Sequence, residues 1–323
     1  MEKLEIKTTL IIPVLNEIKS ITLLLDSIRT QSITPNQIII VDAGSVDGTQ
    51  LSVQKWWDEF QWKGTELELI DGANSYPGRA RNLGVQSSKH DWVVFIDAGI
   101  VPNVDWIECL MRCALSNPLV PASFGLCLFE PDDIVSTAVA SVSYGLQVKH
   151  LALPASIFHK SIFDSIGYFR EDLRAAEDHE WFARFKISYG ELPICEKAVV
   201  HYREIPNSYR VVFSKWRRAA YFSCLAKTKK LQAFFYSLLP VILVAFSFIN
   251  LYLILSLIII YFLIRGIILP LRKNGLHLRP ISLKLLFNIF ISVVVIDSAK
   301  SLGFVSGLIK IYLINKVDSM KKI

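Results

Sequence analysis

Residues 37–49 read QIIIVDAGSVDGT, an apolar run that ends in an aspartate and a glycine-containing turn. A run without polar alternation is typical of a strand in a parallel sheet that is covered on both faces. TTLIIPV at residues 8–14 and WVVFID at residues 92–97 have the same character. These three segments predict the central strands of one buried sheet.

Helical periodicity separates the predicted strands. Ile21, Leu24, Leu25 and Ile28 recur at the spacing of one helix face within residues 17–30. The other predicted elements are a strand over 66–70 and helices over 49–60, 79–88 and 103–115. This alternation predicts an α/β fold with a mostly parallel sheet.

Polar residues collect where these strands end. Asn16 and Glu17 follow the first strand, Asp42 and Asp47 the second, and Asp97 the fourth. Right-handed crossovers bring the carboxyl ends of such strands to one edge, where ligands bind in open sheets. A single aspartate after a strand is often a helix N-cap, and Asp47 fits that role. Three polar strand ends at one edge predict a ligand site.

A nucleotide bound at this edge would have to be held by side chains. The sequence contains neither the Walker A motif nor the glycine pattern of dinucleotide-binding proteins. Arg79 and Arg81, in PGRARN at residues 77–82, are candidates for phosphate binding, because a guanidinium can donate two parallel hydrogen bonds. Solvated arginines at the start of a helix are the alternative interpretation.

Charge is divided unevenly along the chain. Residues 1–202 contain 17 Lys and Arg against 26 Asp and Glu, whereas residues 203–323 contain 18 against 3. This division does not suit a nucleic-acid-binding protein with a general basic surface. With 52% hydrophobic and 20% charged residues, the composition also excludes intrinsic disorder.

The basic part contains a long apolar run. The 34 residues between Lys230 and Arg265 have no formal charge, and a membrane-spanning helix needs about 20. We expect a hairpin of two helices over about residues 231–269, turning near Asn250. Basic residues flank the run on both sides, so the positive-inside rule places both ends in the cytoplasm.

A further apolar stretch begins at Leu283, and Asp297 and Lys300 interrupt it. We expect an interfacial or re-entrant helix over about residues 283–313, with a third membrane span as the alternative.

The first residues do not have the pattern of a secretory signal, so the acidic part is expected on the cytoplasmic side of a multi-pass membrane protein. Five dispersed cysteines suit a reducing compartment. Buried thiols are favoured over a zinc site, because structural zinc requires four ligands.

Four motifs occur in a distinctive order: LIIPVLNE, IIIVDAGSVDGT, GRARNLG and VVFIDAG. Together they resemble the family 2 glycosyltransferases, whose nucleotide-sugar-binding fold is called GT-A. The likeness extends over about residues 8–220, and FHKSIFDSIGYF at residues 158–169 is similar to the acceptor-side segment of the family. We therefore expect a GT-A-like catalytic domain over residues 1–220 and a membrane-associated region over residues 221–323.

The resemblance implies a donor pocket made by the first two strand ends. Asp42 would contact the base of a nucleotide sugar, and Pro13, Asn16 and Glu17 would shape the pocket around it.

The resemblance also implies the reacting groups. Glu177-Asp178 in AAEDHEW matches the family's acidic pair, with Asp178 as the general base of an inverting transfer. Asp97 is the first carboxylate of the metal-binding D-x-D, and His201 in VVHYRE matches a histidine near the diphosphate. Gly99 stands where the family usually has its second aspartate.

The glycine at position 99 affects which groups would bind the expected divalent cation, Mg²⁺ or Mn²⁺. Because such sites use few protein carboxylates and complete the shell with substrate phosphates, we expect Asp97, His201 and the diphosphate to hold the cation. Weak metal binding and an inactive protein are the alternatives.

The resulting hypothesis is an inverting glycosyltransferase that moves a sugar from a nucleotide sugar to a lipid-linked or cell-surface saccharide. The Q-x-x-R-W motif of processive members is absent, and FSKWRRAAYF occupies residues 213–222. A polyprenyl-phosphate glycosyltransferase and a non-catalytic membrane scaffold are the alternatives. The basic stretch between Arg203 and Lys230 would cradle a polyprenyl pyrophosphate or act only as topogenic charge.

Overall fold

A computed structural model describes residues 6–60, 62, 64–117, 119–146, 148–247, 251–274 and 282–320. The chain forms two compact units that alternate along the sequence. The first consists of Met1–Leu128, Lys149–Asp172 and Glu177–Glu204, and the second of Phe129–Val148, Leu173–Ala176 and Ile205–Ile323. A single domain boundary at residue 220 therefore stays a prediction.

The first unit is built on an eight-stranded mixed sheet in the order β3-β2-β1-β4-β7-β6-β8-β5. The four strands that come first in the chain are parallel, as predicted: β1 (Thr8–Val14), β2 (Gln37–Asp42), β3 (Glu66–Asp71) and β4 (Trp92–Ile96). The other strands are β5 (Ile100–Pro102), β6 (Ala122–Phe129), β7 (Lys149–His159) and β8 (Ile194–Tyr202). β7 runs antiparallel to β4, which gives the sheet its mixed character.

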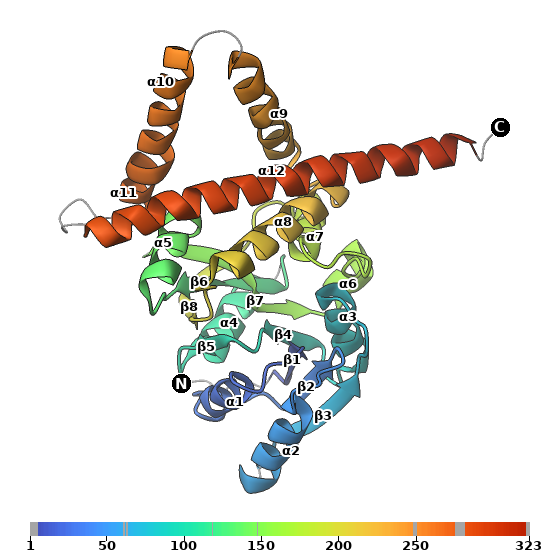
Figure 1. Cartoon of the computed structure of the whole chain (residues 1–323). Helices are drawn as coiled ribbons and strands as arrows, with labels where there is room; N and C mark the ends of the chain where they lie inside the picture. The colour runs from blue at the N-terminus through green and yellow to red at the C-terminus, as the bar shows by residue number, and fades with distance from the viewer. Residues whose placement is uncertain are drawn as a thin grey trace. The chain divides into compact units, whose positions relative to one another are not determined.

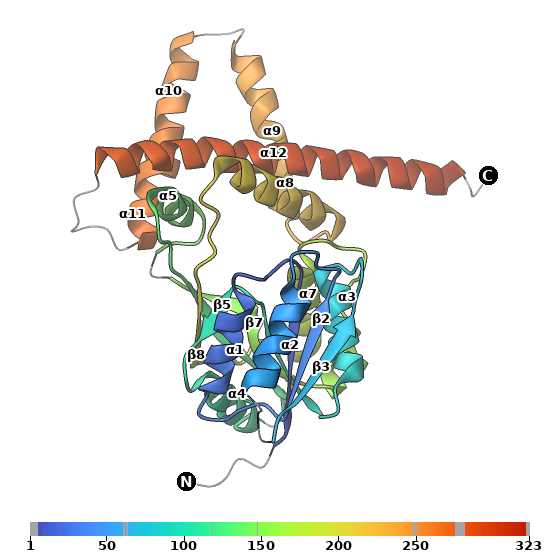
Figure 2. The ribbon, with the colours of Figure 1, turned by 60° about the horizontal axis from the view of Figure 1, so that its bottom comes forward.

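Helices cover this sheet (Figures 1 and 2). They are α1 (Ile21–Arg29), α2 (Thr49–Phe60), α3 (Pro77–Ser87), α4 (Trp106–Leu115), α6 (Ser161–Ile166) and α7 (Glu177–Tyr189). α3 contacts β1 and β2, whereas α4 contacts β7 and β8. α1 buries Ile21, Leu24, Leu25 and Ile28, the face that its periodicity predicted. The expected α/β class, with a GT-A-type sheet, is confirmed.

An aromatic cluster joins α6 and α7 to the centre of the sheet. Phe158 on β7 lies 5.1 Å, centroid to centroid, from Trp181 on α7 and 5.9 Å from Phe95 on β4. The Trp181 indole donates to the carbonyl of Gly167 at 3.0 Å, so its polar atom is satisfied despite burial. Trp181 is one turn after Glu177, and Phe95 precedes Asp97 by two residues. The core therefore positions both acidic segments.

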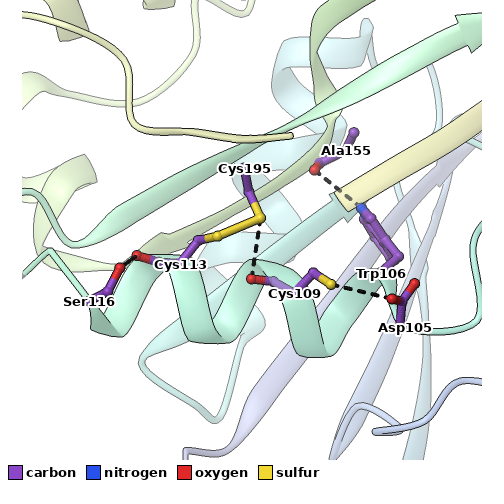
Figure 3. The surroundings of a disulfide bond; sticks show 7 residues. All are labelled: Asp105, Trp106, Cys109, Cys113, Ser116, Ala155 and Cys195. Carbon is purple, nitrogen blue, oxygen red and sulfur yellow. Dashed lines mark hydrogen bonds between the residues drawn. A yellow bond between two sulfur atoms is a disulfide. The ribbon is translucent and has the colours of Figure 1, made fainter. Parts of the chain in front are cut away.

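A disulfide joins α4 to β8 through Cys113 and Cys195, whose Cα atoms are 6.0 Å apart (Figure 3). The expectation that the cysteines are thiols is wrong for this pair. Their separation of 82 residues hides the pairing in the sequence. Disulfides are typical of oxidising compartments, so the cysteines give no support to a cytoplasmic location.

We expect three reactive thiols in the denatured, unreduced protein, because Cys109, Cys127 and Cys224 are free. After reduction the count should rise to five. Thiol titration with a chromogenic disulfide reagent measures both states. Five thiols before reduction would contradict the disulfide. If the disulfide is present, the double variant Cys113→Ser/Cys195→Ser should lower the unfolding midpoint. An unchanged midpoint would also contradict it.

The second unit is helical. Its elements are α5 (Ile134–Ser143), α8 (Tyr209–Leu225), α9 (Lys230–Ser247), α10 (Leu251–Phe262), a π-helical segment (Leu263–Ile268), α11 (Leu269–Asn274) and α12 (Leu283–Met320). α8 packs along α12 at two glycines. A Cβ at Gly303 would collide with the backbone of Arg217, and one at Gly307 with Cys224. Small residues thus allow the two helices to approach closely.

α9 and α10 form a pair that projects from α12 (Figures 1 and 2). α12 contacts α9 and the π-helical segment that follows α10. The predicted turn at Asn250 lies outside the described residues. Within the described residues, two helices are long and apolar enough to cross a membrane: Leu255–Lys273 and Leu283–Val317. The number of crossings stays a prediction. The stretch expected over about 283–313 is part of one continuous helix that runs through Asp297 and Lys300.

The apolar helices of this unit are joined by one charged network. The Asp297 side chain on α12 is 4% exposed and receives two hydrogen bonds from Arg265, at 2.6 and 2.9 Å. Tyr236 on α9 and Tyr261 on α10 donate to the same carboxylate at 3.0 and 2.7 Å. Because every partner lies in another helical segment, the charge that interrupts the apolar pattern holds the helices together.

Asp297→Leu is expected to lower the free energy of unfolding by on the order of 3–5 kcal/mol, because it leaves the Arg265 guanidinium buried without a partner. The double variant Arg265→Leu/Asp297→Leu should recover part of this loss, since no buried charge remains. Urea unfolding in detergent compares the three proteins. Equal stability of the single variant and the wild type would show that the network is not stabilising.

Candidate active site

A cavity of about 270 Å³ opens at the carboxyl edge of the parallel strands. Four predicted site residues lie in its lining: Pro13, Glu17, Arg81 and Asp97. The other lining residues are Val14, Leu15, Ala43, Ser75, Pro77, Ala80, Ala98, Gly99, Tyr202 and Glu204. The sheet therefore brings the ends of β1 and β4 together, as the strand pattern predicts.

Asn16 connects the turn after β1 with the turn after β2. Its backbone N–H donates to Ser45 Oγ at 2.8 Å, and its Oδ1 accepts from the backbone N–H of Val46 at 2.9 Å. Asn16 has φ 58°, a left-handed conformation that asparagine adopts more readily than most residues. Asn16 is not among the lining residues, and its role in shaping the pocket stays a prediction.

Asp42 is 2% exposed, and its neighbour Ala43 lines the cavity whereas Asp42 is not among the lining residues. Its Oδ1 accepts from the backbone N–H groups of Gly44 and Ser45, at 3.0 and 2.8 Å. Its Oδ2 is buried and has no partner among the described residues. An unpaired buried oxygen is costly. The contact of Asp42 with a nucleotide base stays a prediction.

Arg81 is the centre of the site. It is 4% exposed, and its guanidinium donates to Glu177 Oε1 at 2.8 Å and to Asp97 Oδ1 at 2.9 Å. The nearby carboxylates of Asp97, Glu177 and Asp178 raise the pKa of Arg81 despite its burial. Burial raises the pKa of Glu177, and Arg81 opposes that effect. One cation thus joins the end of β4 to the start of α7.

Asp178 follows Glu177 in the first turn of α7 and is partly exposed. Its charge is close enough to raise the pKa values of Arg81 and Glu177. Its Oδ1 accepts from the backbone N–H of His179 at 2.7 Å. The acidic pair predicted from the sequence therefore lies beside the Asp97 end of the cavity, with Glu177 buried and Asp178 accessible.

Apart from Arg81, the GRARNLG segment makes mainly packing and hydrogen-bond contacts within the first unit. Asn82 donates to the carbonyl of Phe169 and to Glu171, both at 2.9 Å, and accepts from the N–H of Phe169 at 3.0 Å. A Cβ at Gly84 would collide with Ile11, so α3 lies tightly against β1. Arg79 is exposed and lies outside the cavity lining. Sequence reasoning missed these contacts because their partners lie far along the chain.

His201 is not part of the cavity lining. Its Nε2 hydrogen bonds with Asn103 Oδ1 at 2.9 Å, and it pairs with Val101 across β5 and β8. Side chains alternate along a strand, and Tyr202 is the neighbour that reaches the cavity. The role of His201 as a metal ligand stays a prediction. Glu204, which sequence reasoning missed, lines the cavity instead.

Comparison with known proteins defines the class of this fold. A mannosyltransferase from Pyrobaculum calidifontis, solved in complex with GDP-Man and Mn²⁺, is similar with a TM-score of 0.62. It is 18% identical in sequence, and the match covers 95% of this chain and 89% of that one. The likeness shows a GT-A fold.

Residues 9–124 match the model of Glycosyl transferase family 2. This match agrees with the family resemblance that the four motifs carry.

Two curated relatives are similar over most of the first unit. The poly(ribitol-phosphate) beta-N-acetylglucosaminyltransferase of Staphylococcus aureus is 22% identical over 213 residues, 61% of this chain and 35% of its own. The O-antigen chain rhamnosyltransferase of Salmonella typhimurium is 26% identical over 214 residues, 61% of this chain and 66% of its own. The chain thus spans about a third of one relative's length and two thirds of the other's.

Arg81→Met is expected to lower the free energy of unfolding by on the order of 3–5 kcal/mol, because Glu177 loses its buried partner. Arg79→Met, the same change at an exposed position two residues away, should cost less than about 0.5 kcal/mol. Urea unfolding measures both. A double variant, Arg81→Met/Glu177→Gln, should recover part of the loss.

The loss in the free energy of unfolding caused by Arg81→Met should depend on pH. Without the cation, burial favours the neutral Glu177 carboxyl, whose pKa is already raised. The variant should therefore be least destabilised at pH values below the ordinary pKa of glutamate and lose stability as pH rises through the raised value. Unfolding midpoints at acidic and neutral pH test this sign, and a constant loss would contradict it.

Proposed function

We propose that the protein is an inverting glycosyltransferase that transfers a sugar from a nucleotide sugar to a lipid-linked or cell-surface saccharide. The observation that carries this proposal is the Arg81 bridge, which places the Glu177-Asp178 pair at the Asp97 end of the cavity. A donor site at the strand ends and an accessible carboxylate beside it are the two parts that such a transfer needs.

The donor is held at the ends of β1, β2 and β4. The free Oδ2 of Asp42 accepts from the base, and Pro13 and Glu17 form the adjoining wall, with Asn16 and the β2 turn fixing its shape. Arg81 keeps Asp97 oriented toward the diphosphate. Arg79, exposed on the same helix, is available to an approaching phosphate.

Asp178 is the general base of the proposed reaction. It accepts the proton of the acceptor hydroxyl while that oxygen attacks the sugar from the face opposite the diphosphate. Glu177 is a positioning residue, because Arg81 engages it. A bound divalent cation, Mg²⁺ or Mn²⁺, would neutralise the negative charge that develops on the departing diphosphate. Asp97 presents its second carboxylate oxygen for that purpose.

A hollow in the second unit supports an anionic, lipid-linked acceptor. It has a volume of about 400 Å³ and is lined by Lys227, Lys229 and Lys230 together with Phe234 and Ile311. Lysine ammonium groups bind phosphate, and the apolar wall suits a hydrocarbon chain. The same chemistry favours the second candidate, a polyprenyl-phosphate glycosyltransferase. Mass spectrometry of the product separates the two, since the second gives one sugar on a monophosphate carrier.

The proposed location follows from the same unit. Residues 221–323 are the membrane-associated region and residues 1–220 the catalytic domain, which faces the cytoplasm, where nucleotide sugars are made. Basic residues before and after the apolar hairpin support this orientation.

Donor binding tests the proposal directly. We expect a nucleotide sugar to raise the unfolding midpoint of the purified chain, because a ligand that binds only the folded state stabilises it. A screen of common nucleotide sugars, with Mn²⁺ or with chelator, measures the shift. If no nucleotide sugar is bound, hydrolysed or used for transfer, the non-catalytic scaffold explains the protein better.

Asp178→Asn is expected to lower the transfer rate by about 10²–10⁴-fold, the contribution of a general base, and to leave donor binding nearly unchanged. The matched control is Asp58→Asn, an exposed aspartate on α2. Initial rates and the donor-induced unfolding shift are measured on both variants. A normal transfer rate in the Asp178→Asn variant would show that another residue is the general base.

A further inference from the structure

Glu204 occupies the place that a side chain at position 99 would need. A Cβ atom added to Gly99 would stand 2.6 Å from Oε2 and 2.8 Å from Cδ of Glu204. Close-packed atoms do not approach so closely, so the two side chains compete for one space. The turn that lacks the second aspartate of the family motif therefore has a carboxylate from another segment in its place.

The register of β5 and β8 brings Glu204 to this position. The strands pair antiparallel, with Ile100 opposite Tyr202. Ile100–Tyr202 is the last pair at this end, and Ala98 and Glu204 each lie two residues beyond it in the chain. Asp97 and Glu204 both line the cavity. The end of this strand pair thus brings the two carboxylates to the same cavity.

The charges at this cavity are not balanced. Glu17, Asp97 and Glu204 line it, and the one cation in the lining, Arg81, is shared by Asp97 and Glu177. Across the ranges that the structure describes, no Lys or Arg forms an ion pair with Glu204. Carboxylates without a protein cation are the ligands that Mg²⁺ and Mn²⁺ prefer.

Two buried donors that belong to lining residues also lack partners among the described residues. They are Ser75 Oγ, in a residue 7% exposed, and Arg81 Nε, in a residue 4% exposed. A buried donor without an acceptor costs about 1–3 kcal/mol, which an oxygen of a bound ligand would relieve. Carboxylates that favour a cation beside donors that favour an anion fit a cation bound together with a diphosphate.

We propose that Glu204 supplies the second carboxylate ligand of the divalent cation, in place of the aspartate missing at position 99 and of His201. This inference rests on the proposed function. Asp97 and Glu204 hold the cation, and donor diphosphate and water complete its shell. Among the described residues, no three Asp, Glu, His or Cys side chains form a ready metal site.

Mn²⁺ binding tests the role of Glu204 without a turnover assay. Electron paramagnetic resonance of free Mn²⁺ measures affinity in the full-length protein, with UDP or GDP present. Glu204→Gln keeps the size and removes the charge, and it should weaken Mn²⁺ binding by about tenfold or more. Glu196→Gln, the same change at an exposed position on β8, should bind Mn²⁺ as the wild type does.

The second test introduces a carboxylate at position 99 and removes the carboxylate at position 204. Glu204→Ala removes the crowding atoms, so Gly99→Asp/Glu204→Ala should restore Mn²⁺ affinity to within a few fold of the wild type, whereas Glu204→Ala alone should not. Gly99→Asp with Glu204 present should bind no better than the wild type. If Glu204→Gln does not fold, the comparison of Glu204→Ala with the double variant decides the question.

The outcomes separate this inference from the proposed function. Wild-type Mn²⁺ affinity in Glu204→Gln or in Glu204→Ala, or no Mn²⁺ binding by the wild type with either nucleotide, would overturn the assignment of Glu204. If the wild type then still transfers or hydrolyses a nucleotide sugar, the proposed function stands. Glu204-dependent Mn²⁺ binding without any turnover of a donor would count against the function instead.

Discussion

The site depends on one buried cation. Arg81 lies almost entirely out of solvent, and a guanidinium in such a place is tolerated only when carboxylates surround it with good geometry. Its two partners, Asp97 and Glu177, come from the end of a central strand and the start of a helix. The requirement to neutralise Arg81 therefore keeps the end of β4 and the acidic pair close together.

The packing around Arg81 supports this arrangement. The aromatic cluster holds α7 against β4 and β7, and the close approach of Gly84 to Ile11 holds α3 against β1. Both contacts lie within a few residues of the site, so they determine where Arg81, Asp97 and Glu177 can be. The segment that contains the two candidate phosphate-binding arginines, Arg79 and Arg81, thus also supports the site through its packing.

The second unit uses the same physical principle in an apolar setting. Asp297 is satisfied by Arg265 and by two tyrosine hydroxyls from neighbouring helices. In the sequence these charges look like breaks in a membrane segment, because a linear pattern does not show whether a charge has a partner. Once paired, they join the helices, and α12 continues through Asp297 without interruption.

The sequence by itself determined the parallel strands, the helices between them and the polar strand ends, because apolar periodicity reports local burial and the carboxyl ends of parallel strands meet at one edge. It also placed Asp97 and Glu177-Asp178 near one cavity through the family motifs. Tertiary structure alone decided that Arg81 binds two carboxylates, that His201 lies outside the cavity and that Glu204 stands at Gly99. Those contacts join residues 16 to about 105 positions apart, and only strand register and helix packing determine which of them meet.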